Sequence, residues 1–307
     1  MPERRTALRT LEGVFLAAFS GICFGSMGVA AQVLFTRFGF RPQDLVSIRL
    51  IGAGALMLAL EALFSRRGLL RPLFSDLRNL RDIAVLGAGF VLIQLTFFLS
   101  IDAANAGTAS LMVGFVPLFV ILWLAARERR LLRGREVLCL ALAMAGVALL
   151  VSKGRLSSLD FSVSGVAWGI VSAGFGAFCT LQPGSVIRRT GVRFAVGWAM
   201  ALGGAADLLF TSPFAGGARW TWESAGLYAF IVIFGTVLAF GCYLKSTSYV
   251  PASVTSLLSS FEPLTAVILT VTLLGVPFSA PEAAGAAMVI ANMVILALPR
   301  KGPGGPG

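Results

Sequence analysis

Residues 89–118 read "GFVLIQLTFFLSIDAANAGTASLMVGFVPL", and residues 235–264 read "GTVLAFGCYLKSTSYVPASVTSLLSSFEPL". A constant shift of 146 residues places the first stretch on the second without a gap, and the match continues to Glu136 and Glu282. The identical pairs include Gly89 and Gly235, Ser100 and Ser246, Ala106 and Ala252, Ser110 and Ser256, Phe115 and Phe261, and Pro117 and Pro263. We therefore interpret the chain as two copies of one unit, residues 1–151 and 152–307.

Composition indicates that both copies lie in a membrane. Hydrophobic residues make up 57% of the chain and charged residues 13%, against roughly 45–50% and about 25% in soluble domains. Because about 20 apolar residues cross a bilayer as a helix, we predict an all-α polytopic membrane protein with ten spans. The expected spans are 12–35, 44–64, 82–102, 105–126, 134–151, 162–184, 191–210, 224–245, 251–274 and 279–298.

The positive charges predict how these spans are oriented. With the N-terminus placed in the cytoplasm, nineteen Lys and Arg residues fall on the inner side and five on the outer side, while Arg49 lies within a span. Such a bias is the positive-inside pattern of membrane proteins. We therefore expect a multi-pass protein of a bacterial-type inner membrane with both termini cytoplasmic. The net charge of +11 then orients the chain in the lipid bilayer and does not indicate nucleic-acid binding.

An odd number of spans in each copy has a topological consequence. A second five-helix unit must insert upside-down relative to the first, and such inverted repeats are typical of secondary transporters whose substrate site lies near the midplane. We predict two inverted five-helix repeats around a central cavity, working by alternating access. A channel or a membrane scaffold is the alternative, since sequence cannot show alternating access.

Several segments resemble EamA-type transporters of the drug/metabolite transporter superfamily. They are "SFEPLTAVILTVTLLGVPFSAPEAAGAAMVIANMVIL" (260–296), "ANAGTASLMVGFVPLFVILWLAARERRLLRGREVLCLALAMAGVALL" (104–150) and "PQDLVSIRLIGAGALMLAL" (42–60). In that family a Glu-Pro pair lies in the ninth span and an acidic residue opens the tenth, matched here by Glu262-Pro263 and Glu282. The resemblance implies a cavity lined mainly by spans 1, 3, 4, 6, 8 and 9. The aromatic-rich spans are also similar to those of aromatic amino-acid exporters of YddG type.

Glu262 is an acid in the middle of an expected span. A charge there costs at least about 2.5–3.5 kcal/mol, and the matched position in the first copy is Val116. Three hypotheses remain: a proton-coupling site, a ligand for a substrate amine, or a structural hydrogen-bond acceptor. The prolines that follow, Pro117 and Pro263, predict a bend at the same depth in both copies.

Arg49 is the second charge placed inside an expected span. It either snorkels to the outer interface, as a long basic side chain can, or forms a gating ion pair with Asp102 or Asp44. Asp102 ends the third span on the outer side. The sequence leaves both alternatives open.

The side chains expected to bind substrate are mostly aromatic. Phe97 lies with Phe90 and Gln94 in the third span, Trp168 with Phe175 in the sixth, Tyr243 in the eighth and Phe261 in the ninth. For each Phe a lipid-facing position is the favoured alternative, whereas Trp168 and Gln94 are less suited to lipid and are expected on a cavity wall. On the sixth span, the small residues Gly165, Gly169, Ser172 and Gly176 form a stripe that predicts close helix packing.

Missing residues and motifs narrow the function further. The chain has no histidine, which argues against His-dependent catalysis and His-based metal sites. It also has no "GxxxxGK[ST]" phosphate-binding loop, which argues against transport driven directly by ATP. We therefore expect no enzyme, no cofactor and no metal, in a protein that we expect to be monomeric. The predicted activity is export of small amphipathic metabolites such as neutral or aromatic amino acids, with a broad-specificity drug exporter as the alternative.

Overall fold

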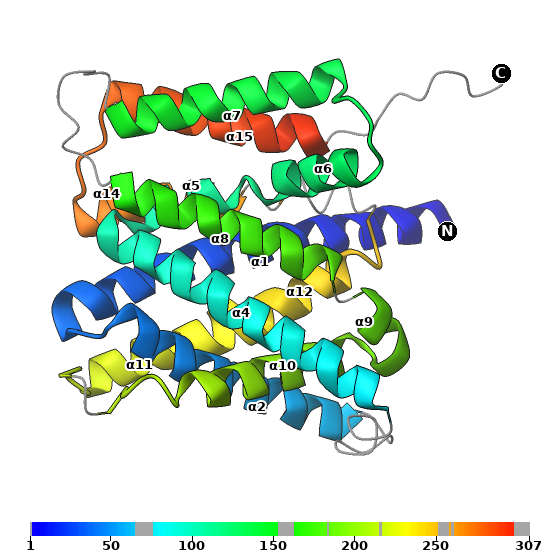
Figure 1. Ribbon diagram of the computed structural model, residues 1–307, viewed down its shortest axis with the longest axis vertical. Helices are drawn as coiled ribbons and strands as arrows, with labels where there is room; N and C mark the ends of the chain where they lie inside the picture. Colours follow the sequence, from blue (N-terminus) through cyan, green and yellow to red (C-terminus); the bar gives the residue numbers. More distant parts are fainter. Residues whose placement is uncertain are drawn as a thin grey trace.

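The computed structural model describes residues 2–64, 76–152, 163–182, 184–214, 217–250, 258 and 261–297, and within them all regular structure is helical. The helices are α1 (Pro2–Phe38), α2 (Pro42–Phe64), α4 (Leu77–Ala103), α5 (Ala106–Val113), α6 (Val116–Arg127), α7 (Gly134–Ser152), α8 (Val163–Leu181), α9 (Gly184–Thr190), α10 (Val192–Asp207), α11 (Trp222–Val232), η1 (Ile233–Leu238), α12 (Ala239–Ser246), α14 (Phe261–Leu274) and α15 (Ala280–Ala297). Helix α1 begins and α15 ends at the same end of the bundle (Figure 1).

Six segments of the described chain are long and apolar enough to cross a membrane. They are Thr10–Phe38, Pro42–Phe64, Leu77–Ala103, Ala106–Arg127, Val163–Leu181 and Trp222–Tyr243, and the apolar helices Phe261–Leu274 and Ala280–Ile295 are shorter. Helices α7 and α10 occupy the remaining expected ranges 134–151 and 191–210. The protein is therefore an all-helical membrane protein.

Two expected spans are not single α-helices. The fourth breaks between α5 and α6 at Gly114 and Phe115, and Pro117 follows in the first turn of α6. There its missing N–H costs nothing, because the first N–H groups of a helix have no partner within it. The matching residues before Pro263, Ser259 and Ser260, lie outside the described residues, so the bend expected there is not tested.

The eighth expected span contains a turn of π-helix, η1, between α11 and α12. A π-helical turn bonds each residue to the fifth one before it and occurs mostly as an interruption of α-helices. The hydroxyl of Thr236 donates to the carbonyl oxygen of Ile231, five residues earlier (2.9 Å). The matched residues 87–92 in α4 are regular α-helix, so the two copies differ here.

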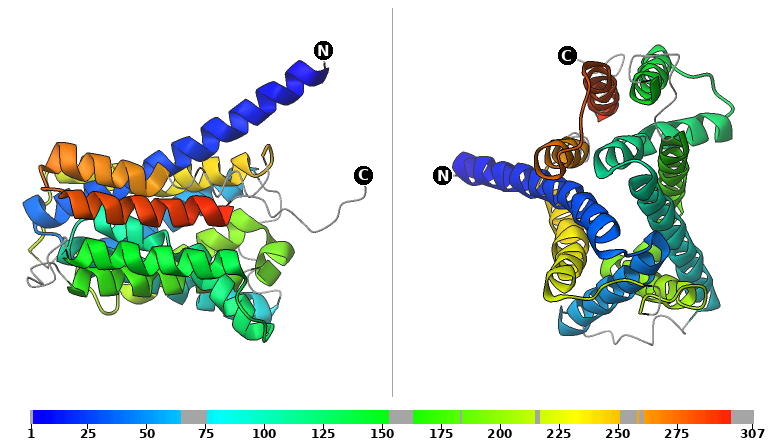
Figure 2. Two further views of the ribbon diagram at one scale, coloured as in Figure 1. Left: turned by 90° about the horizontal axis from the view of Figure 1, so that it is seen from above. Right: turned by 90° about the vertical axis from the view of Figure 1, so that its left-hand side faces the viewer.

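Helix packing pairs elements of one copy with elements of the other. Helix α1 packs on α14 and on α11, η1 and α12, while α8 packs on α5, α6 and α4. Helices α2 and α10 pack together, as do α7 and α15, and the latter pair lies at one edge of the bundle (Figure 2). The packing of α1 on α14 and α12 thus has a counterpart in the packing of α8 on α5, α6 and α4.

Small residues make these contacts close. A Cβ on Gly203 of α10 would lie 2.6 Å from the carbonyl oxygen of Gly87 in α4, and one on Gly285 of α15 equally close to that of Gly146 in α7. The stripe predicted on α8 is buried: its members touch α4, α5 and α6, and Ser172 donates to the carbonyl oxygen of Ile93 (2.9 Å). The prediction of close packing for this face of α8 is confirmed.

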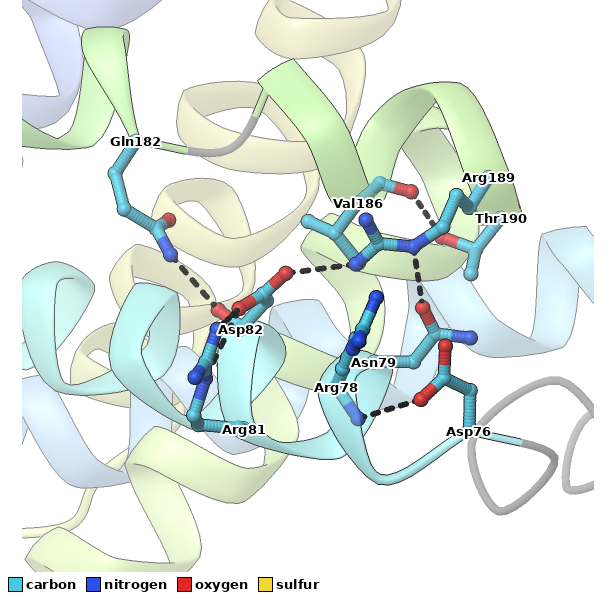
Figure 3. A network of polar contacts seen from close by, with 9 residues as sticks. All are labelled: Asp76, Arg78, Asn79, Arg81, Asp82, Gln182, Val186, Arg189 and Thr190. Atoms are coloured by element: carbon cyan, nitrogen blue, oxygen red, sulfur yellow. Dashed lines mark hydrogen bonds and ion pairs between the residues drawn. The ribbon is translucent and has the colours of Figure 1, made fainter.

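Polar contacts join the two copies at the end where α4 begins (Figure 3). Arg189 of α9 donates through Nε to Asn79 Oδ1 and through Nη2 to Asp82 Oδ2, both at 2.7 Å. Gln182 donates to the carbonyl oxygen of Asp82 (3.3 Å). This end is held by charge-assisted bonds rather than by apolar contact alone.

The paired residues Glu136 and Glu282 have the same structural role. Glu136 Oε2 accepts from the N–H of Arg133, and Glu282 Oε2 accepts from the N–H of Ser279 (2.9 and 2.7 Å), each just before α7 or α15 begins. This is the reach-back half of a capping box. Glu136 also accepts two bonds from Arg130, and these, with a bond to Glu128, raise the pKa of Arg130.

A single methyl group at the α4–α10 crossing tests this packing. Gly203→Ala places a carbon against the Gly87 carbonyl and is expected to lower the free energy of unfolding by about 1–3 kcal/mol through overpacking. Gly174→Ala, where a Cβ meets nothing within 4 Å, is the matched control and should leave it unchanged or slightly raised. Thermal unfolding of both variants in detergent measures the difference; equal midpoints would contradict the close crossing.

Candidate functional site

A cavity of about 480 Å³ lies between α5, α6, α8, α12, α14 and α15. Four predicted residues meet on its wall, although they come from distant parts of the chain: Tyr243, Glu262 and the paired prolines Pro117 and Pro263. The other described residues of its wall are Ser110, Val113, Gly114, Val116, Val120, Ile121, Thr180 and Met293. No described residue of α1 or α4, the helices of expected spans 1 and 3, lines this cavity, whereas α15 contributes Met293.

Glu262 lies in the first turn of α14 and is partly exposed on the cavity wall. Its position is set by α1, because a Cβ on Gly25 would clash with the Glu262 carbonyl oxygen. Only a glycine in α1 allows the two backbones to come this close. The carboxylate accepts no hydrogen bond from the described part of the chain, so the structural-acceptor hypothesis gains no support.

Arg49 is in the interior of the protein, where its side chain is 1% exposed. Its Nε donates to Thr236 Oγ1 of η1 (3.1 Å), its Nη1 donates to Gln94 Oε1 of α4, and its Cζ lies 5.5 Å from the centre of the Phe98 ring. The snorkelling hypothesis is therefore wrong, because the guanidinium does not reach a surface.

The proposed ion pairs of Arg49 are wrong as well. Asp102 is exposed at the end of α4, and Asp44 accepts from the backbone N–H of Ser212 (3.1 Å). The opposite charge that acts on Arg49 is Glu262: the two interact electrostatically without forming an ion pair. Two charges of opposite sign thus act on each other: Arg49, which is buried, and Glu262, which is partly exposed on the cavity wall.

Most of the predicted aromatic residues lie away from the cavity. Phe97 and Phe90 pack in the core, and Trp168 and Phe261 are 40% and 39% exposed. Phe175 lines a separate apolar groove between α4 and α8. Gln94 binds Arg49 and is not on the cavity wall. Among the predicted substrate-binding residues, Tyr243 alone is on the described wall.

Sequence reasoning missed Ser110 as a cavity residue. It is buried in α5, it lines the cavity, and its hydroxyl has no hydrogen-bond partner among the described residues. Its identity with Ser256 in the second copy was visible, but a serine repeated in both copies also fits helix packing.

The Arg49 cluster yields a stability prediction. Gln94→Leu removes a neutral acceptor from a buried guanidinium and is expected to cost about 1–3 kcal/mol of unfolding free energy. Gln94→Glu keeps an acceptor and adds the missing negative charge, so its melting temperature should be above that of Gln94→Leu. Thermal unfolding of both variants tests this, and equal melting temperatures would show that the bond to Gln94 contributes no stability.

Comparisons with known proteins agree with this architecture. The chain is 32% identical, over 298 residues that cover 94% of it and 96% of the relative, to the uncharacterized inner membrane transporter YicL of Salmonella typhimurium. It is 28% identical over 193 residues, 61% of this chain and 62% of the other, to an uncharacterized transporter of Archaeoglobus fulgidus. A solved crystal structure shares the fold with a TM-score of 0.57 at 16% identity, covering 95% of this chain and 96% of the other. The EamA-like transporter family matches twice, over residues 11–152 and 163–298, and the chain belongs to this family of transporters.

Proposed function

We propose that this protein is a ten-span secondary transporter, built of two inverted five-helix repeats, that exports small amphipathic metabolites such as neutral or aromatic amino acids by alternating access. The observation that carries the proposal is the cavity beside both repeat prolines, Pro117 and Pro263, at the break in the fourth span. Reciprocal packing supports the inverted arrangement, since α1 on α14 corresponds to α8 on α5 and α6.

Aromatic rings from both halves pack together at one end of the protein. Phe40 and Trp220 pack with ring centres 4.9 Å apart, and Trp220 contacts Tyr228 and Phe214, each at 5.8 Å. By the charge bias this end is extracellular. The cavity wall instead includes Val120 and Ile121 in α6 and Thr180 near the end of α8, toward the side predicted to be cytoplasmic. The structure is consistent with a conformation that loads from the cytoplasm.

The cavity wall favours substrates with a large apolar part. Its described residues are mainly Val, Ile, Pro and Met, and none of them is Lys or Arg. Phosphorylated metabolites need cations or backbone N–H clusters to balance their charge, so sugar phosphates and nucleotide sugars fit poorly. Small amphipathic molecules match both the volume and the chemistry of the wall.

Orientation is tested by labelling engineered cysteines in whole cells. Leu131→Cys lies on the α6–α7 connection and Trp222→Cys at the start of α11, and the native residues are 93% and 96% exposed. An impermeant maleimide should label Cys at position 222 in intact cells and Cys at position 131 only after permeabilisation. The native chain, which has four cysteines, sets the background. The opposite pattern would invert the orientation.

Transport is tested with purified protein in proteoliposomes. The panel comprises neutral and aromatic amino acids, aromatic amines, a set of cationic drugs and sugar phosphates. We expect saturable uptake and counterflow of the amino acids, because a carrier exchanges bound substrate across the membrane whereas a channel does not. Counterflow of drugs with unrelated chemical structures would favour the broad-specificity exporter. Transport confined to phosphorylated compounds would refute the proposal.

A further inference from the structure

The cavity wall holds two polar groups without a hydrogen-bond partner in the described chain. They are the buried hydroxyl of Ser110 in α5 and the carboxylate of Glu262 in α14, which is partly exposed on the cavity wall; these two helices pack against each other. Buried polar groups in proteins are nearly always paired, and one left unpaired costs about 1–3 kcal/mol, more when it is charged. Thr180 on the same wall differs, because its hydroxyl already donates to the carbonyl oxygen of Gly176 (2.8 Å).

The chemistry of these groups selects the sign of the ligand. A carboxylate only accepts hydrogen bonds and a hydroxyl can accept as well, while no described residue of the wall carries a positive charge. Tyr243 lies on the same wall, and aromatic rings attract cations. An anionic group would meet repulsion here, whereas a positively charged donor would pair both free acceptors.

We propose that the cavity binds its substrate through a protonated primary amine, held by the carboxylate of Glu262 and the hydroxyl of Ser110, with the apolar body of the ligand against Val113, Val116 and Ile121. This inference rests on the proposed transport function and names the group by which that same cavity recognises its substrate. The three donors of an ammonium group suit two or more acceptors that face one cavity.

The charge of Arg49 predicts whether the cavity prefers an amino acid or a simple amine. It does not line the cavity, but its charge interacts with that of Glu262. A simple amine adds a net positive charge beside Arg49 and Glu262, whereas an amino acid brings a carboxylate with its ammonium group and leaves the total charge unchanged. Because uncompensated buried charge is costly, we expect an amino acid to bind more tightly than the amine that lacks its carboxylate.

Binding to the full chain in lipid nanodiscs, measured by calorimetry, tests the proposal with three probes. They are phenylalanine, phenethylamine, which lacks the carboxylate, and 3-phenylpropionate, which lacks the amine. We expect phenylalanine to bind more tightly than phenethylamine and 3-phenylpropionate to show no saturable binding. Equal affinity for 3-phenylpropionate would overturn the proposal, and binding of phenethylamine alone would keep the amine site but identify amines as the ligand class.

Substitutions of Glu262 and Ser110 test whether these two side chains hold the amine. Glu262→Gln should weaken phenylalanine binding by roughly tenfold to a hundredfold, and Ser110→Ala by about threefold to tenfold. The controls are Glu223→Gln and Thr272→Val, both at exposed positions outside the cavity, which should keep the affinity of the native chain. If Glu262→Gln fails to fold, the affinities of Glu262→Asp and Ser110→Ala for phenylalanine test the proposal instead.

The remaining outcomes separate this inference from the proposed function. Unchanged affinity in a folded Glu262→Gln variant overturns the amine site, and it assigns Glu262 to coupling if transport also loses its dependence on a proton gradient. Amine-dependent binding without counterflow of any probe leaves the amine site standing and refutes the transport proposal. Counterflow with equal affinity for all three probes refutes the amine site and leaves the transport proposal standing.

Discussion

The buried guanidinium of Arg49 is the interaction on which the centre of this protein depends. It joins α2 to Gln94 of α4, in the first half of the chain, and to Thr236 of η1, in the second. Both acceptors are neutral, so hydrogen bonds and the Phe98 ring offset the cost of burying the charge only in part. The remaining compensation comes through space from Glu262, which is why the cavity and the core cannot be treated as separate regions.

The helices around Arg49 come from both copies of the repeat, but several of their interior polar residues have no polar counterpart in the other copy. The shift of 146 residues pairs Gln94 with Phe240, Thr236 with Phe90, and Glu262 with Val116. The prolines and the capping carboxylates Glu136 and Glu282, by contrast, are the same in both copies. The two copies thus share these groups that shape the backbone, whereas the Gln94, Thr236 and Glu262 side chains that act on Arg49 are each present in one copy only.

The sequence predicted the helical segments and several local devices correctly, because these depend on near neighbours in the chain. Hydropathy located the apolar helices, the small-residue stripe located the packed face of α8, and Pro117 located a break. It could not assign the aromatic residues, since Phe97 in a core, Phe175 in an open groove and a cavity-lining Phe all look alike when lipid itself is apolar. Nor could it find the partners of Arg49, which come from helices distant in sequence.

The π-helical turn at η1 has a consequence for how the two copies compare. Successive residues of an α-helix are about 100° apart around its axis, and a π turn takes in one more residue than an α turn. Every side chain after η1 is therefore rotated out of phase with its partner in α4, although the residue count between matched positions is the same. Tyr243 stands on the cavity wall while its counterpart Phe97 lies in the core. A change in winding, without any insertion in the sequence, is enough to turn duplicated helices toward different surroundings.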